Sequence, residues 1–166
     1  MNFLEKDLEE VIFTADKFVL DCRGLPTHGR MVRQLNLGRY GKLDLLTVSR
    51  NISLFEKYLT FTIYELKKDV IGISAFLQAI SYAKGIQEFM ETKKPKTAFN
   101  IEICLIGKTL DKTGSFCYLP DLLSYSEPFH VQGQITNVTF YTYHFDIDGF
   151  SFKNENGYYI SNAFKK

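Results

Sequence analysis

Two acidic residues and one lysine in this sequence could together bind a divalent cation and act on a phosphate. Asp44 lies within an apolar segment, 42–48, where an ionised carboxylate is costly unless a partner satisfies it. Glu65 and Lys67 are two residues apart in a second such segment, 58–67, so on a strand their side chains project from the same face. Paired carboxylates suit Mg²⁺ or Mn²⁺, whose other coordination positions take water and phosphate oxygens. A lysine beside such a cation can orient the attacking water, so the three residues favour phosphodiester hydrolysis.

The periodicity of apolar residues predicts the elements that would bring these groups together. Apolar residues three and four apart predict helices, and alternating β-branched and aromatic residues predict strands. The expected helices are 2–19 and 74–91, and the expected strands are 32–37, 42–48, 58–67 and 99–106. This α-β-β-β-α-β order predicts an α/β fold with a mixed central sheet flanked by helices. If the second and third strands pair, Asp44, Glu65 and Lys67 converge near one end of that sheet.

The sequence after Gly107 is less regular and predicts β additions to this core. One strand is expected within 131–144, and the turn residues 146–149 lead into a second strand, which together favour a hairpin. A chain of 166 residues is expected to form a single domain, 1–166, because a second independent core would be cramped. We divide it into a core, 2–106, and a β-rich extension, 107–166.

Composition excludes several classes of protein. Hydrophobic residues make up 45% and charged residues 23%, which is typical of globular proteins. No apolar run reaches the roughly 18 to 20 residues that span a bilayer, and the acidic N-terminal segment is unlike a signal peptide. Three cysteines without a Cys-x-x-Cys pair predict free thiols and a cytoplasmic location, and the histidines lack metal-ligand spacing. The net charge of +1 argues against electrostatic coating of nucleic acid, but it is compatible with acids that hold a cation.

The order of these residues resembles a known superfamily, the PD-(D/E)XK nucleases. Asp44 followed by Glu65-Leu66-Lys67 is similar to the superfamily's Asp…Glu-x-Lys core, although Leu43 stands where the usual proline would be. Two flanking motifs add to the resemblance, which covers residues 2 to about 106. The helix 74–91 carries Gln78 and Tyr82, similar to the Gln-x-x-x-Tyr motif of the RecB-like branch. The first helix carries Glu5 and Leu8, similar to the Glu-x-x-Leu helix of archaeal Holliday-junction resolvases and of flap and mismatch endonucleases.

The resemblance implies a restriction-endonuclease-like fold and a role for each motif residue. Asp44, Glu65 and the backbone carbonyl of Leu66 would bind Mg²⁺ or Mn²⁺, and Lys67 would position the attacking water. Glu5 would be an outer acid from the first helix, with Glu9, one turn later, as the alternative. Gln78 and Tyr82 would contact the phosphate backbone or order the lysine. The expected activity is that of a metal-dependent endonuclease whose substrate is nucleic acid, and DNA in particular.

Other interpretations of the same residues remain open. Glu65 and Lys67 could form a solvated pair worth less than about 1 kcal/mol, and Gln78 and Tyr82 could belong to an ordinary amphipathic helix. The whole chain could be a catalytically inactive nuclease-like domain that binds nucleic acid or protein. The C-terminal hairpin could build a homodimer with two active centres. Basic residues in or near the loops before Asp44 are candidates for contacting phosphates. They are Arg23, Arg30, Arg33 and Arg39, of which Arg33 and Arg39 are expected to bind substrate.

Overall fold

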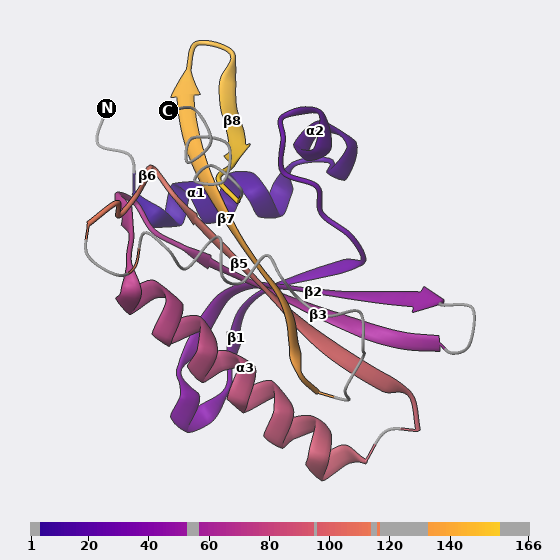
Figure 1. The fold of residues 1–166 in the computed structure, drawn as a ribbon. Coiled ribbons are helices and arrows are strands. Elements are labelled where there is room, and N and C mark those ends of the chain that lie inside the picture. The colour runs from indigo at the N-terminus through magenta and orange to yellow at the C-terminus, as the bar shows by residue number, and fades with distance from the viewer. Residues whose placement is uncertain (1–3, 53–56, 95, 114–115, 117–132, 157–166) are drawn as a thin grey trace, which may run out of the picture.

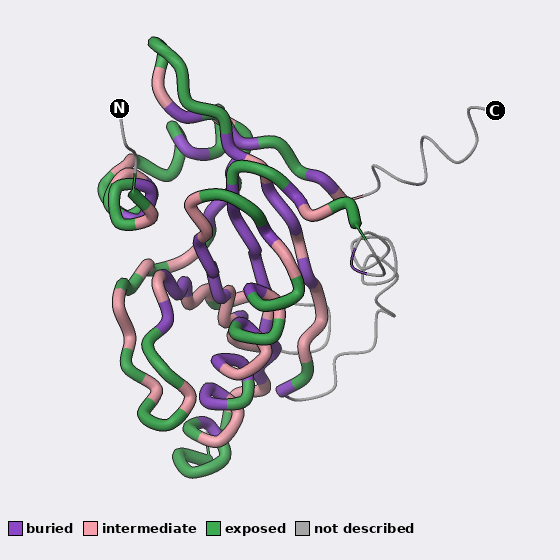
Figure 2. The backbone as a smooth tube through the Cα atoms, turned by 90° about the vertical axis from the view of Figure 1, so that its left-hand side faces the viewer, coloured by how far each residue is buried: buried purple, intermediate pink, exposed green. Residues whose placement is uncertain are grey.

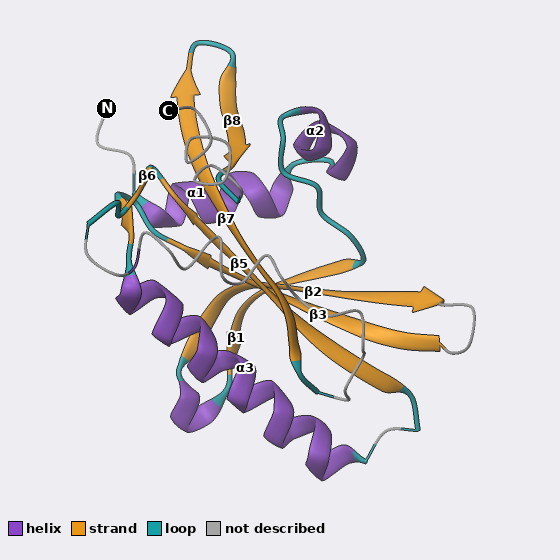
Figure 3. Ribbon diagram, viewed as in Figure 1, coloured by secondary structure: helices purple, strands orange, loops and turns teal. Residues whose placement is uncertain are grey.

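The protein is an α/β structure built on one mixed six-stranded sheet, as the order of predicted elements indicated (Figures 1 and 3). The computed structural model describes residues 4–52, 57–94, 96–113, 116 and 133–156. The sheet order is β1-β2-β3-β5-β7-β8, and the strands are β1 Arg30–Asn36, β2 Lys42–Ile52, β3 Lys57–Leu66, β5 Ala98–Gly107, β7 Ile135–Asp146 and β8 Gly149–Asn154. The pairs β3–β5 and β5–β7 are parallel, and the other neighbours are antiparallel. Two short strands, β4 Val70–Ile71 and β6 Thr109–Leu110, form a separate parallel pair.

Helices cover both faces of the sheet because its central strands are apolar on both sides (Figures 1 and 2). The long helix α3, Ile73–Lys93, packs on one face, where Ala75, Ala79 and Ala83 allow a close approach to the sheet. The helix α1, Glu5–Thr14, covers the other face with Leu8 and Ile12. Successive strand residues alternate between the two cores. The prediction that helices flank a mixed sheet is therefore confirmed.

The prediction of one continuous helix over 2–19 is wrong. The chain leaves helical geometry at Ala15, where ψ is 146°, and a second helix, α2 Lys17–Cys22, begins after Asp16. The Asp16 carboxylate accepts a hydrogen bond from the backbone N–H of Phe18 at 2.8 Å, which satisfies one of the free donors at the start of α2. The apolar spacing continues across this break, so periodicity alone does not reveal it. Residues 1–3 of the predicted helix lie outside the described residues.

The N-cap of α2 provides a test of this break. Asp16→Ala removes the acceptor for the Phe18 N–H, so we expect a loss of about 1 kcal/mol in the free energy of unfolding, the usual value for such caps. Urea titration followed by circular dichroism measures the difference. Asp21→Ala, on the exposed side of the same helix, is the control. An equal effect of both substitutions would contradict the capping role.

The predicted C-terminal hairpin is confirmed by the antiparallel pair β7 and β8, which turns at Gly149 with a φ of 101°. The strand β7 is interior to the sheet, because it lies between β5 and β8. Its Val138 and Phe140 are buried in the core beneath α3. Two of the six strands thus come from the extension, 107–166, and parts of that extension, 117–132 and 157–166, lie outside the described residues.

The sheet forks where β2 leaves β3. The hydrogen-bonded register of this pair runs from Ile52 opposite Lys57 to Leu45 opposite Tyr64 and stops there, while β3 continues beside β5 as far as Leu66. Figure 1 shows β1 and β2 curving toward α3 beyond this point. The curvature is sharp, because Leu43 and Leu45, which would share a face in a flat strand, pack in different cores.

The bend coincides with an unusual backbone conformation. Gln34 of β1 lies opposite the bend with a φ of 54°, in the left-handed region that residues other than glycine rarely adopt. Its register partner by position is Asp44, between the pairs Arg33–Leu45 and Leu35–Leu43. Gln34 and Asp44 therefore lie side by side where β2 separates from β3.

Candidate active site

Asp44 lies where β2 and β3 separate. Beyond Tyr64 the β2 strand no longer pairs with β3, so the backbone N–H of Leu66 lacks its usual carbonyl acceptor. The Asp44 carboxylate takes that place and accepts from this N–H at 3.0 Å. Burial raises the pKa of Asp44 to about 6, and the nearby charges of Glu5 and Glu9 act in the same direction. The hydrogen bond from Leu66 opposes this rise.

Glu65 is the most deeply buried ionisable group at the fork, with a side chain that is 1% exposed. One carboxylate oxygen, Oε1, accepts a hydrogen bond from the Lys67 ammonium at 2.6 Å. The other, Oε2, is buried and has no hydrogen-bond partner among the described residues. Burial raises the pKa of Glu65 to about 7, and repulsion from Asp44 and Glu5 adds to the rise. A buried carboxylate oxygen without a donor is costly, and either a proton or a bound cation would satisfy it.

Lys67 is held between Glu65 and a hydrogen-bonded chain from α3. Its ammonium also donates to Gln78 Oε1 at 3.3 Å, and the Gln78 amide donates to the Tyr82 hydroxyl at 2.6 Å. The Tyr82 hydroxyl donates in turn to the backbone carbonyl of Lys42 at 2.9 Å. These contacts join α3 to the ends of β2 and β3 through a continuous set of side chains. Tyr82 is also buried in the core, so the amphipathic-helix interpretation holds for its ring while its hydroxyl faces the site.

The protonation of Lys67 follows from its neighbours. Burial acts to lower its pKa, but the hydrogen bond to Glu65 and the surrounding carboxylates outweigh this, and the pKa of Lys67 is raised above its ordinary value. The amine is therefore an ammonium at neutral pH. It can donate hydrogen bonds to a water molecule or a phosphate oxygen, but it is poorly suited to removing a proton.

Glu5 and Glu9 both extend from α1 toward the fork but make different contacts. Glu5 accepts from the backbone N–H of Lys68 at 3.2 Å, which ties the start of α1 to the end of β3. Its charge acts on Asp44 and on Glu65. Glu9 is buried and accepts from the Gln34 side-chain amide, and its charge acts on Asp44. The charge of Glu5 therefore raises the pKa of both acids of the pair.

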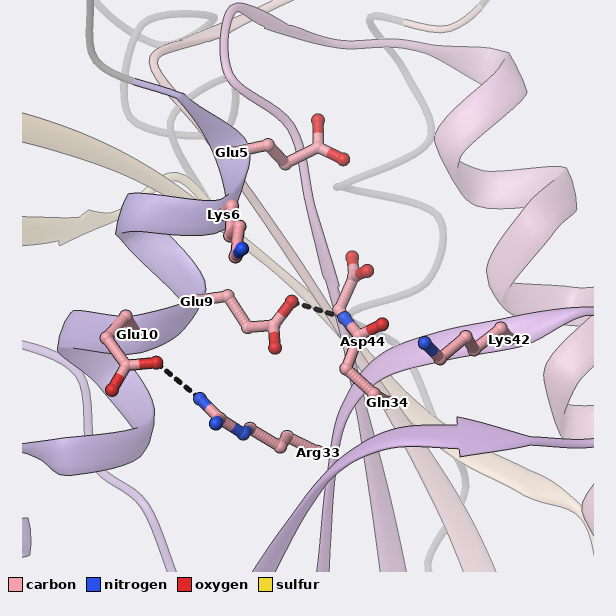
Figure 4. Close-up of a pocket in the computed structure, with 8 residues that line it drawn as sticks. All are labelled: Glu5, Lys6, Glu9, Glu10, Arg33, Gln34, Lys42 and Asp44. Atoms are coloured by element: carbon pink, nitrogen blue, oxygen red, sulfur yellow. Dashed lines mark hydrogen bonds and ion pairs between the residues drawn. The ribbon is translucent and has the colours of Figure 1, made fainter.

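An open pocket of about 630 Å³ lies beside Asp44, between α1 and the β1–β2 ribbon (Figure 4). Its lining residues are Glu5, Lys6, Glu9, Glu10, Arg33, Gln34, Lys42 and Asp44. Arg33 forms an ion pair with Glu10 on one side of this pocket. Sequence reasoning did not select Lys6, Gln34 or Lys42. Lys42 could have been found from its spacing, since it precedes Asp44 by two residues in the same strand.

Arg39 lies outside the set of residues that line the pocket beside Asp44. It pairs with Glu88 on α3 at 2.6 Å and stacks over the ring of Tyr40 at 5.0 Å, and it is not among the residues that line the pocket. Arg23 is also engaged elsewhere, because it donates to the backbone carbonyl of Phe150 at 2.9 Å. Of the arginines expected near the site, the structure brings Arg33 to the pocket, and it holds Arg39 and Arg23 in other contacts.

The described residues contain no group of three or more His, Cys, Asp or Glu side chains already arranged to hold a metal ion. The fork instead offers the Asp44 and Glu65 carboxylates, with Glu5 nearby. Mg²⁺ commonly binds proteins through one or two carboxylates and keeps several waters, so this donor set fits its chemistry. At Leu66 it is the N–H that Asp44 engages, and a role for the Leu66 carbonyl as a ligand stays a prediction.

Comparisons with protein-family models, with curated proteins and with solved structures found no match to this chain. The resemblance to PD-(D/E)XK nucleases therefore rests on the motif residues and their positions. In the part of the chain that the structure describes, no helix combines the length and the apolar character needed to cross a membrane.

Proposed function

We propose that this chain is a metal-dependent nuclease of the PD-(D/E)XK type that hydrolyses phosphodiester bonds in DNA. The observation that carries the proposal is the buried Glu65 carboxylate, which has an ammonium on one oxygen and no partner among the described residues on the other. Asp44 is coupled to it electrostatically, and the pKa values of both acids are raised. A divalent cation would relieve the repulsion between these acids and satisfy the free oxygen.

Each side chain then has a defined task. Asp44 and Glu65 would hold Mg²⁺ or Mn²⁺, which when bound supplies charge neutralisation at the phosphate and a more acidic water. The Lys67 ammonium donates to the attacking water or to a non-bridging phosphate oxygen. Gln78 and Tyr82 keep that ammonium in place. Glu5 anchors α1 beside the two acids through the Lys68 N–H.

The reaction balances as a hydrolysis. The oxygen of water forms a bond to phosphorus, and the bond from phosphorus to the 3′ oxygen breaks in line with it. One proton of the water is released to solvent, and the leaving oxygen takes up a proton. The products are a 5′-phosphate and a 3′-hydroxyl, as the resemblance implies.

The first experiment incubates the purified protein with Mg²⁺ or Mn²⁺ and with single-stranded, duplex and branched DNA, and with RNA as a comparison. Cleavage of a DNA substrate that EDTA abolishes supports the proposal. Absence of cleavage on every substrate contradicts the enzyme proposal. Binding of DNA without cleavage would instead support the catalytically inactive binding module.

Binding of the cation is measured separately from cleavage. Titration with Mn²⁺, followed by calorimetry or by electron paramagnetic resonance, should show one site that Asp44→Asn weakens sharply. Asp21→Asn, an exposed acid on α2, serves as the matched control and should bind Mn²⁺ as the unchanged protein does. Equal binding by both variants would remove Asp44 from the site.

Gln78 is expected to position the Lys67 ammonium. Gln78→Leu removes the link between Lys67 and Tyr82, so we expect kcat to fall roughly tenfold, which corresponds to the loss of about one hydrogen bond. Affinity for Mn²⁺ and KM should stay unchanged, because Gln78 contacts neither acid in the described structure. Gln87→Leu, two and a half turns further along α3, is the control on the same helix. A fall in Mn²⁺ affinity in place of kcat would contradict the positioning role.

A further inference from the structure

Two lysines of the pocket beside Asp44 have no acidic partner among the residues that the structure describes. Lys6 extends from α1 and Lys42 from β2, so the two ammonium groups enter the pocket from facing walls (Figure 4). Neither forms an ion pair within the described ranges. By contrast, the third base of the pocket, Arg33, is neutralised by Glu10.

The acids of the pocket are already engaged by other groups. Glu10 pairs with Arg33, Glu9 accepts from the Gln34 amide, and Glu5 accepts from the Lys68 N–H. These contacts hold the carboxylates on the α1 wall. Among the described residues that line the pocket, Lys6 and Lys42 are therefore the basic groups that can meet a ligand.

The charge of the pocket depends on whether a cation occupies the fork. Once the Arg33–Glu10 pair is set aside, three carboxylates, those of Glu5, Glu9 and Asp44, face the two ammonium groups of Lys6 and Lys42. The empty pocket therefore carries a net negative charge and repels phosphate. A divalent cation shared by Asp44 and Glu65 reverses the sign, since Glu65 is already balanced by Lys67. The pocket then attracts an anion.

We propose that Lys6 and Lys42 bind the phosphodiester groups that flank the scissile phosphate, and that the pocket accepts this strand only after the cation is bound. This inference rests on the proposed function, because the cation and the scissile phosphate belong to that site. The ligand is a polyanionic strand, since two ammonium groups on facing walls suit successive phosphates better than an isolated one. The residues contact the backbone and carry no information about base sequence.

The experiment measures binding of fluorescent single-stranded and duplex DNA to the protein with Lys67 intact, in Mg²⁺ and in EDTA, over a range of salt concentrations. The DNA carries phosphorothioate linkages, which keep the negative charge and resist hydrolysis. Each phosphate contact contributes about 0.9 to the slope of log K against log salt on duplex DNA and about 0.7 on single strands. Lys6→Gln and Lys42→Gln are each expected to reduce the slope by about that amount. Duplex affinity at 0.1 M salt should then fall about eightfold for each substitution. In EDTA, binding should be much weaker and insensitive to both substitutions.

The control is Lys57→Gln, because Lys57 is exposed at the far end of β3, about 26 Å from Glu65 at the usual rise per strand residue. Binding by this variant should match that of the unsubstituted protein. If Lys6→Gln and Lys42→Gln bind DNA as the unsubstituted protein does, and the unsubstituted protein still cuts ordinary DNA, the inference fails and the proposed function stands. If no form of the protein binds or cuts DNA, both fail. Displacement of the strand by a nucleoside monophosphate at equal phosphate concentration would also overturn the inference.

Discussion

Lys67→Ala is expected to reduce the rate of DNA cleavage by about 10² to 10⁴-fold, the range typical for removing a group that assists proton transfer or stabilises charge in the transition state. The pKa of Lys67 is raised by Glu65 and the neighbouring acids, so the group lost is an ammonium donor. The effect should appear in kcat, because the donor acts on the attacking water or on the charge that develops at phosphorus. Single-turnover cleavage with saturating Mg²⁺ measures it.

Two further variants separate this role from a structural one. Lys67→Arg keeps a cationic donor and should recover part of the lost rate, although its planar head cannot reproduce the contacts to both Glu65 and Gln78. Lys57→Ala, at the other end of β3, should cut as the unsubstituted protein does. Mn²⁺ binding by Lys67→Ala should persist, since the carboxylates remain. A Lys67→Ala protein that cuts at the normal rate would remove the lysine from the mechanism.

Glu65→Gln is expected to stabilise the metal-free protein at pH 8. The folded-state pKa of Glu65 is about 7 because of burial, while the unfolded chain has the ordinary glutamate value near 4.5. Between these two pKa values the folded state binds more protons than the unfolded state does. The free energy of unfolding therefore falls as the pH rises through this window. Above the folded-state pKa, the full cost of ionising the buried Glu65 lowers the free energy of unfolding. A pKa shift of this size corresponds to about 3 kcal/mol. The glutamine side chain removes the charge and can still accept from Lys67.

The measurement is urea denaturation in EDTA at pH 5 and pH 8. The unsubstituted protein should be less stable at pH 8 than at pH 5, and Glu65→Gln should remove most of that difference. Glu91→Gln, an exposed acid near the end of α3, is the control and should change stability by less than about 0.5 kcal/mol. Higher stability of the unsubstituted protein at pH 8 would contradict the prediction.

Divalent cations should offset the loss of stability that the ionised Glu65 causes at pH 8. Binding to the folded state alone stabilises it by about 2.7 kcal/mol when the free cation is at 100 times its Kd. At pH 8 we therefore expect Mn²⁺ to raise the melting temperature of the unsubstituted protein and to leave that of Glu65→Gln nearly unchanged. The same carboxylate would then destabilise the empty protein and bind the cation, which is the relation between stability and function that the buried Glu65 oxygen implies.

Features that depend on short spacing could be predicted from the amino-acid sequence. A two-residue period places Glu65 and Lys67 on one face, and their side chains meet at 2.6 Å. A four-residue period places Gln78 one turn before Tyr82, and these side chains also meet. Local periodicity likewise indicated the main strands and the long helix, and so the mixed sheet, but it missed the break between α1 and α2. The correct inferences held because neighbours along a regular helix or strand keep fixed relative positions.

The contacts between groups that are distant in the chain could not be predicted in this way. The bend at Gln34 and the separation of β2 from β3 after Tyr64 let the Asp44 carboxylate accept a hydrogen bond from the Leu66 N–H. No local sequence pattern predicts either feature. The pairing of Arg39 with Glu88 likewise depends on how α3 lies against the sheet. Lys6 and Lys42 face one pocket because α1 packs across the β1–β2 ribbon. Such contacts join segments far apart in the chain, so they follow from packing and strand pairing, which periodicity along the sequence does not encode.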